Sequence, residues 1–346
     1  MEILKPEQYP EYDAFVRGHK NGSFTQGINW ADVKKQWKHE VVVSRDSSGA
    51  IKGGMLILIR RMPLFGYSMM YAPRGPVFDY EDMDTLNDLI AGAKAVSDKY
   101  KGYSLLCDPY ILADDDKLIE AFQKAGFGFK PNQKFGHTIQ ARENYMLTDF
   151  DKLTKDTLLS HMGSKTAYKM RYGKKKGVQC LVCGSDKIED FMAVYKSSAG
   201  RQSFNVRSAE YLKNFLDSLG DDARLYLCYY DGQPLAGGIS VNYAGRLCHV
   251  YGGSSDVHRE LRATYLLQWE MMNWALETGC RIYDMQGIVT DEKENPALYG
   301  VYEFKKSFNG EVVTFAGEFD YSFRPFGKWL VETALNVRST LRHLKK

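Results

Sequence analysis

The sequence contains no long hydrophobic run and no leader of the secretory type. Its longest apolar stretches, such as MLILI at 55–59, are far shorter than the roughly 20 residues that a membrane-spanning helix requires. The N-terminal residues MEILKPEQYPEYD have neither the basic start nor the apolar segment of a signal peptide. We therefore expect a cytoplasmic protein in a reducing environment.

Cysteine and histidine are few and show no metal-binding pattern. Six cysteines are scattered along the chain, and the single C-x-x-C, Cys180 and Cys183, has no second pair at zinc-site spacing. The seven histidines are dispersed. No P-loop, H-E-x-x-H or G-x-S-x-G motif is present, which argues against P-loop nucleotide hydrolases, zinc proteases and α/β-hydrolases. We expect no metal, and cysteines that serve mainly as small buried apolar residues.

A strong excess of charge of one sign is also missing. The net charge is +3, which does not by itself point to a polyanionic partner, and the composition of 44% hydrophobic and 26% charged residues is that of a globular protein. One segment differs from this average: between Lys152 and Lys176, eight residues are Lys or Arg against the single acid Asp156, with Tyr168 and Tyr172 among them. This pattern predicts an anion-binding or nucleic-acid-binding surface, and its alternative is a solvated basic helix face.

The two halves of the chain repeat one order of elements. Each half has three strand-like runs, then a helix and a further strand, and each has a Gly-Gly pair before an apolar run. The helix of the first half, at about 81–100, carries one apolar stripe. The repeated order predicts an α/β (α+β) fold of two duplicated units joined between about 142 and 157. Chance is the alternative, because β-β-β-α-β order is common. The matched segments are 41–60, 67–79, 81–100 and 103–110 in the first half and 225–243, 247–255, 263–278 and 281–287 in the second.

A β-β-β-α-β unit that occurs twice resembles the acyl-CoA N-acyltransferase (GNAT) fold. Ordinary members of that fold bind the pyrophosphate of coenzyme A at a glycine-rich loop before the central helix, where backbone N–H groups face the phosphates. The corresponding segment of the second half, DVHRELRATYLLQ, lacks those glycines, and that of the first half, DYEDMDTLNDL, is acidic. Coenzyme A is therefore not the expected donor.

The stretch 281–321 has the features of a ligand crevice. A short strand stops at Gln286-Gly287, an acidic loop with one proline follows, and then the lysine pair Lys305-Lys306 stands among aromatic residues. In α/β proteins, strand ends and the polar loops after them often line binding sites. The alternative is an ordinary strand, loop and helix with a solvated lysine pair.

Four segments together resemble the Fem family of peptidoglycan bridge-forming aminoacyltransferases: WADVKKQW, YAPRGPVFDY, GGSSDVHRELRATYLLQWEMMNWALETGCRIYDMQGI and LYGVYEFKKSFNGEVVTFAGEFD. The resemblance implies two tandem GNAT-like domains, 1–148 completed by 317–346, and 149–316. It implies transfer of an amino acid from aminoacyl-tRNA to an amine of the peptidoglycan stem peptide. The acceptor would be UDP-MurNAc-pentapeptide or the lipid-linked precursor lipid II, with no metal or coenzyme.

The resemblance also implies catalytic residues. Lys305 in EFKKSF matches the family lysine near the reacting ester, with Phe304 beside it. A cation there can stabilise the oxyanion formed during aminolysis. Asp108 lies where the strand predicted at 103–110 breaks into a turn. It matches a family aspartate proposed as a base toward the attacking amine. The alternative is that Asp108 holds this turn.

Four further residues match acceptor ligands of the family. Lys34 in WADVKKQW and Arg207 in NVRSAEY match ligands of the acceptor diphosphate, and Tyr211 and Tyr251 match aromatic residues that contact the acceptor. Two cationic side chains suit a diphosphate, and arginine can bind it in bidentate fashion. For Lys34 and Arg207 the alternative is plain surface charge.

The chain departs from the family pattern at Gln286, where glycine is usual. Its basic helix matches that of the family only loosely, so we assign no single tRNA ligand there. The chain also has no room between Gly184 and Asp222 for the charged helical hairpin, or coiled-coil insertion, of many members. The tail 325–346 predicts an amphipathic helix that contacts the inner membrane surface or packs on the protein. Two other functions stay open: acyl transfer from another activated donor, and non-catalytic binding of a cell-wall precursor or RNA.

Overall fold

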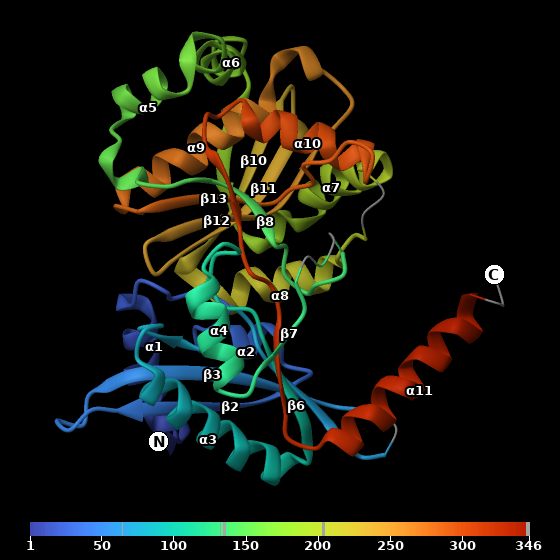
Figure 1. Ribbon diagram of the computed structural model, residues 1–346. Helices are drawn as coiled ribbons and strands as arrows, with labels where there is room; N and C mark the ends of the chain where they lie inside the picture. The colour runs from blue at the N-terminus through green and yellow to red at the C-terminus, as the bar shows by residue number, and fades with distance from the viewer. Residues whose placement is uncertain (64, 132, 134–135, 203–204, 344–346) are drawn as a thin grey trace. The chain divides into compact units, whose positions relative to one another are not determined.

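The computed structural model describes residues 1–63, 65–131, 133, 136–202 and 205–343, with side chains to residue 337 (Figure 1). The chain forms two compact units: residues 1–140 with 315–346, and residues 141–314. The expected boundary after residue 148 assigned 143–147 to the first unit. In the structure these residues form strand β8 (Glu143–Leu147), which pairs with strands of the second unit.

The first unit contains one mixed sheet in the order β1-β2-β3-β4-β6-β15-β7, with β5 paired to β3. The apolar residues of one sheet face pack against α3 and α4 to form its core. The elements are β1 (Glu2–Ile3), α1 (Tyr9–Gly18), α2 (Asn29–Val33), β2 (Lys38–Arg45), β3 (Ile51–Arg61), β4 (Ser68–Ala72), β5 (Val77–Phe78), α3 (Met83–Tyr100), β6 (Gly102–Cys107), α4 (Asp116–Lys124), β7 (Gly128–Phe129), β15 (Phe319–Ser322) and α11 (Pro325–His343).

The second unit contains a mixed sheet in the order β14-β8-β13-β12-β11-β10-β9. Helix α9 lies on one face of this sheet and contributes most of its apolar side chains to the core. The elements besides β8 are α5 (Lys155–His161), α6 (Gly163–Lys175), β9 (Gln179–Cys183), α7 (Ile188–Gln202), α8 (Ala209–Leu219), β10 (Ala223–Tyr230), β11 (Gln233–Tyr243), β12 (Arg246–Ser254), α9 (Ala263–Glu277), β13 (Ile282–Gly287), α10 (Pro296–Lys306) and β14 (Glu311–Thr314).

The repeat predicted from the sequence is confirmed by the topology. The runs β2-β3-β4-α3-β6 and β10-β11-β12-α9-β13 have the same order, with two antiparallel pairs followed by a parallel pair across the helix. The strand that pairs with the last strand of this run comes from a different part of the chain in each unit. In the first unit β15, from the C-terminal segment, pairs with β6, whereas in the second unit β8 pairs with β13. The C-terminal segment thus completes the first sheet.

Local sequence signals explain the helix that organises the first unit. The Asp82 carboxylate accepts from the backbone N–H of Thr85 and caps the N-terminus of α3, and Lys101 ends the helix in the left-handed conformation. The predicted apolar stripe is buried at Leu86, Leu89 and their neighbours one and two turns on. The segment WADVKKQW has helical spacing in the sequence but is helical only to Val33, because a turn leads from there into β2.

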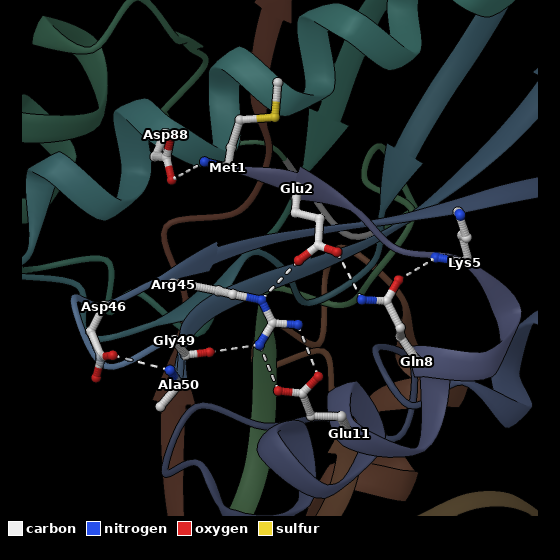
Figure 2. A network of polar contacts seen from close by, with 10 residues as sticks. All are labelled: Met1, Glu2, Lys5, Gln8, Glu11, Arg45, Asp46, Gly49, Ala50 and Asp88. Atoms are coloured by element: carbon white, nitrogen blue, oxygen red, sulfur yellow. Dashed lines mark hydrogen bonds and ion pairs between the residues drawn. The ribbon is translucent and has the colours of Figure 1, made fainter.

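A polar network fixes the short N-terminal strand β1 (Figure 2). Figure 2 shows the Arg45 guanidinium bridging Glu2, at 2.8 Å, and both carboxylate oxygens of Glu11, at 2.6 and 2.8 Å. The N-terminal ammonium lies 2.9 Å from Asp88 on α3. A two-residue strand has few ladder hydrogen bonds, so these charge-assisted contacts supply much of what holds it.

Four of the six cysteines are buried, as expected for small apolar residues: Cys107, Cys228, Cys248 and Cys280. Within the described residues, no group of three or more His, Cys, Asp or Glu side chains is placed to hold a metal ion. No helix in the part of the chain that the structure describes is both long and apolar enough to cross a bilayer.

Candidate active site

The candidate site of the second unit lies where β12 and β13 diverge. These strands pair in parallel only from Arg246 to Cys248 on β12, and β13 then ends at Gly287. Helix α10 follows, started by the Asn295 side chain, which accepts from the N–H of Leu298, and by a proline in its first turn. Its last turn carries Lys305 inward, so the lysine is only 8% exposed. The sequence suggested a lysine beside a strand end, and the fold produces that arrangement.

The ammonium of Lys305 is held by main-chain oxygens at the end of β13. It donates to the carbonyl of Gly287 at 2.8 Å and to that of Gln286 at 3.1 Å. Burial lowers the pKa of Lys305 to about 8, although the nearby Asp284 carboxylate acts in the opposite direction. An ammonium has three N–H donors. With two directed at carbonyl groups, Lys305 is a rigid cation with one donor left for a reacting oxygen.

Asp284 builds the strand end that holds this lysine. Its buried carboxylate accepts from the backbone N–H of Gln286 at 2.7 Å, from the Asn144 amide at 3.2 and 3.3 Å and from Arg246 at 3.4 Å. Gln286 consequently adopts a positive φ of 64°, a conformation that non-glycine residues rarely take. With Gln286 in this conformation, the carbonyl groups of Gln286 and Gly287 both accept from Lys305.

Replacing Gln286 by glycine should therefore stabilise the protein slightly. The left-handed backbone costs a side-chain-bearing residue about 1–2 kcal/mol, and glycine loses part of this gain through its greater freedom in the unfolded chain. We expect Gln286→Gly to raise the free energy of unfolding by up to about 1 kcal/mol, and Gln286→Val to lower it because β-branched residues tolerate positive φ poorly. Denaturant unfolding would measure both. Equal destabilisation by both would contradict this explanation.

Aromatic rings wall the site on one side. Phe304 contacts the ring of Tyr265, at the start of α9, edge-on with centroids 5.1 Å apart, and packs against Phe308 at the same distance. Lys306 points away: it is exposed, lies 3.6 Å from Glu303 and sits over the ring of Tyr302. The two adjacent lysines therefore have different surroundings, as expected for neighbours on a helix.

His249, the residue after the last β12–β13 pair, stays neutral beside Lys305. Burial and the charge of Lys305 lower the pKa of His249 to about 4. Its Nδ1 lies 3.0 Å from the Gln268 amide nitrogen, and Gln268 in turn accepts from the Tyr283 hydroxyl at 2.7 Å. The ring lies against Gly252, where a Cβ would come within 2.6 Å of Nε2. Of the two basic groups, Lys305 therefore carries the proton near neutral pH.

The predicted acceptor residues of the second unit lie together: Arg207 just before α8, Tyr211 on α8 and Tyr251 on β12. The Arg207 guanidinium lies over the ring of Tyr211, 5.4 Å from its centroid. Burial, the charge of Tyr211 and a hydrogen bond with it raise the pKa of Tyr251. Phe215 packs edge-on against Tyr251 at 5.4 Å. The exposed arginine beside two tyrosine hydroxyls can bind an anionic group with attached polar atoms.

Asp108 lies in the first unit, buried just beyond the end of β6. Its carboxylate accepts from the Tyr71 hydroxyl at 2.7 Å and from the backbone N–H of Arg74 at 2.6 Å. Burial raises the pKa of Asp108, and these contacts together with the charge of Arg74 oppose that shift. Arg74 has a φ of 53°, and its guanidinium lies 5.0 Å from the ring centroids of both Tyr110 and Phe315. Asp108 thus has a clear role in fixing the turn after β4.

Lys34, also in the first unit, directly follows α2. Its ammonium lies over the ring of Trp30, 4.7 Å from the centroid, and the residue is half-buried. Its neighbour Lys35 is exposed. The structure therefore brings together Lys305 with Phe304, and Arg207 with Tyr211 and Tyr251, within the second unit. It places Lys34 and Asp108 in the first unit.

Sequence reasoning did not identify Asp284, His249 and Tyr265 as parts of the site. Asp284 lies in 281–287, the segment that matches 103–110 with Asp108 in the repeat, and both carboxylates hold a turn through a backbone N–H. Tyr265 lies in the first turn of α9, and that position could have been recognised from the repeat as the end of the central helix nearest the ligand crevice.

Comparison with known proteins identifies the family of the chain. The model of the FemAB family matches residues 8–233 and 229–335. The chain belongs to the FemAB family. Curated relatives include the UDP-N-acetylmuramoylpentapeptide-lysine N(6)-alanyltransferase of Weissella viridescens, 29% identical, covering 89% of this chain and 91% of that protein. The lipid II:glycine glycyltransferase of Staphylococcus epidermidis is 26% identical and covers 90% of each.

Solved structures of other proteins have a fold similar to that of this FemAB family member. A crystal structure of FemX matches with a TM-score of 0.87 at 23% identity, covering 96% of this chain and 100% of that one. A tandem GNAT protein from the clavulanic acid biosynthesis pathway matches with a TM-score of 0.51 at 11% identity, over 92% and 97% of the two chains. The predicted tandem GNAT-like fold and the family resemblance are both confirmed.

Proposed function

We propose that the protein is an aminoacyltransferase that moves an amino acid from aminoacyl-tRNA to an amine of the peptidoglycan stem peptide, with UDP-MurNAc-pentapeptide or lipid II as acceptor. The observation that carries the proposal is the buried ammonium of Lys305, held by two carbonyl groups beside Phe304 in a member of the FemAB family. The two relatives described above support the acceptor, since one is named as a glycyltransferase acting on lipid II and the other as an alanyltransferase acting on the lysine of UDP-MurNAc-pentapeptide.

The chemistry of aminolysis fits this site. The neutral acceptor amine attacks the ester carbonyl, and the tetrahedral species carries negative charge on oxygen. When this species collapses, the bond between the carbonyl carbon and the tRNA ribose oxygen breaks, and the ribose hydroxyl leaves with the proton that the amine gives up. An activated ester supplies the driving force, so the enzyme has to position two large substrates and stabilise that charge. A fixed, buried ammonium is suited to this task because it needs little reorganisation when the charge develops. Asp108, whose oxygens are engaged by protein donors, acts here through the turn it holds.

Product analysis tests the proposal. The protein is incubated with pooled charged tRNAs and with UDP-MurNAc-pentapeptide or lipid II, and the acceptor mass is read afterwards. We expect a gain of one amino-acid residue with charged tRNA, and no gain with acetyl-CoA. A gain of an acetyl group would instead support acyl transfer from another donor. No gain with any donor, together with tight precursor binding, would support a non-catalytic binder.

We also propose that α11 contacts an anionic membrane surface. The residues Gly327 and Val331 on one side of the helix are buried, whereas Phe326, Trp329 and Val337 on another side are 69%, 59% and 54% exposed. The sequence after Glu332 contains no acid and four Lys or Arg residues. Exposed aromatic residues with a basic segment are typical of helices that lie in the membrane interface. Leu341 and Leu344, two apolar residues further along the predicted helix, lie beyond residue 337 and therefore outside the described side chains.

Vesicle binding would test this contact. We expect the full chain to sediment with anionic vesicles, less so as salt rises, because the attraction is screened over about 8–10 Å near physiological ionic strength. The double change Phe326→Ser/Trp329→Ser should reduce binding several-fold, and Leu335→Ser, on another side of the same helix, should not. Equal sedimentation with neutral and anionic vesicles would contradict the proposal.

A further inference from the structure

The C-x-x-C motif does not form one site in the structure. Its two cysteines lie three residues apart on β9, so their side chains point to opposite faces of the strand. Cys183 stands opposite Leu225 of β10, whereas Cys180 stands directly opposite Cys228. The two strands are antiparallel, and directly opposite residues of such strands project from the same face. Cys180 therefore has a cysteine neighbour that spacing in the sequence does not indicate.

The backbone places Cys180 and Cys228 at disulfide distance. Directly opposite Cα atoms of antiparallel strands lie about 4.5 or 5.5 Å apart, and both values fall within the range of about 4.4–6.8 Å that disulfides require. The Cβ atoms of such a pair are about 4.5–5.5 Å apart and must approach to about 3.5–4.5 Å. Strand β9 lies at the edge of its sheet, next to β10, so a shift of this size disturbs one ladder only.

The two thiols differ in their surroundings. Cys228 is fully buried, and its thiol donates to the carbonyl of Ala263, the first residue of α9, at 3.6 Å. Cys180 is half-buried and packs against the same core. Burial and a hydrogen bond with the Cys180 thiol raise the pKa of Cys228. Because the thiolate is the reactive form of cysteine, Cys228 is a poor target for an oxidant on its own.

A cavity of about 360 Å³ gives access to Cys180. Besides this cysteine its lining includes Lys174 of α6 and Leu266 and Glu270 of α9. A water molecule takes up about 30 Å³ of the liquid, so the cavity has room for a small hydroperoxide. A cation beside a cysteine favours the thiolate, which Lys174 does and Glu270 opposes. An accessible cysteine next to a second, resolving cysteine is the arrangement that redox-sensitive sites share.

We propose that Cys180 and Cys228 form a reversible modification site, which a small hydroperoxide converts to a disulfide. The Cys180 thiolate attacks the hydroperoxide, an S–O bond forms as the O–O bond breaks, and an alcohol, or water from hydrogen peroxide, leaves with the thiol proton. The Cys228 sulfur then attacks the resulting sulfenic acid, so that the S–S bond forms, the S–O bond breaks and water leaves. Two thiols lose two electrons in total, and the hydroperoxide gains them.

Peptide mapping of the full-length protein tests the proposal. The reduced protein is treated with hydrogen peroxide, digested without reduction and analysed by mass spectrometry. We expect a link between the peptides that contain Cys180 and Cys228, an intact mass lower by that of two hydrogen atoms, and return to the starting mass with dithiothreitol. Cys183→Ser is the matched control on the same strand and should form the same link at the same rate. A link from Cys180 to Cys183, or to a second molecule, would contradict the proposal.

Two further variants test the order of the steps. In Cys228→Ala the sulfenic acid on Cys180 has no resolving thiol, so the probe dimedone should label Cys180 there much more than in the wild type. In Cys180→Ser, Cys228 should react at least about tenfold more slowly than Cys180 does in the wild type, because buried thiols are inert. The wild type decides the matter even if Cys228→Ala does not fold. Peroxide that leaves its Cys180 unchanged, or oxidises Cys180 to sulfinic acid while Cys228 stays a thiol, would overturn the inference.

Discussion

Lys305→Ala is expected to lower the rate of amino-acid transfer by about 10²–10³, the loss that follows removal of one oxyanion donor. The physical reason is that the ammonium is fixed by the carbonyl groups of Gln286 and Gly287 and is buried, so its charge acts at short range through a poorly polarisable medium. Affinity for the acceptor should hardly change, because other residues than Lys305 are expected to bind the acceptor. Single-turnover transfer at saturating substrates measures the rate, and calorimetry measures the affinity.

Lys306→Ala is the matched control for this change. It removes the same charge one residue further along α10, from a side chain that is exposed and pairs with Glu303. Surface pairs of this kind contribute little, so the variant should stay close to the wild type in both rate and stability. Equal losses in the two variants would mean that the helix, rather than the buried ammonium, is what matters.

Charge reversal at Arg207 is expected to have the second largest effect, on acceptor binding. A hydrogen bond to a charged group is worth about 1.5–3 kcal/mol, so Arg207→Glu should raise the Kd for UDP-MurNAc-pentapeptide by at least about tenfold, and repulsion of the diphosphate adds to that loss. The guanidinium over the Tyr211 ring, with Tyr251 close to that ring, is the geometry behind this expectation. Calorimetry with the soluble precursor would measure it.

Lys213→Glu provides the comparison for Arg207→Glu. Lys213 is exposed on α8, two residues beyond Tyr211, and its replacement changes the net charge by the same amount. If both variants weaken binding equally, the effect is one of overall charge and Arg207 is not a direct ligand. Lys34→Glu can be compared in the same way with Lys35→Glu in the first unit.

Much of the fold could be predicted from the sequence because it repeats. Periodic apolar residues marked α3, a generally apolar run marked α9, and the order of strands around the two helices indicated the duplicated unit. The strand that completes each sheet could not be read from periodicity. The segments 143–147 and 319–322 are short, and the pairing of β8 with β13 and of β15 with β6 depends on contacts distant in sequence.

The site could be predicted only in part. Lys305 and Phe304 were identified from the motif around them, but the pairing of Lys305 with two carbonyl groups depends on the left-handed Gln286, which the motif did not indicate. The contacts of Tyr265 with Lys169 and with Phe304 join three elements that are far apart in the chain. Such contacts follow from packing of α6, α9 and α10, and local sequence carries little information on them.

The account requires that Lys305 act as a charged group, and the pH dependence of its contribution tests this most directly. The pKa of Lys305 is lowered to about 8, so the side chain is protonated below that pH and becomes neutral above it. The measurement is the ratio of single-turnover rates of the wild type and Lys305→Met across this range, because titration of the acceptor amine affects both proteins and cancels. We predict a large ratio at pH 7 that falls as pH rises through about 8. A ratio that rises through this pH, as for a neutral lysine acting as a base, or a ratio near one throughout, would contradict the account.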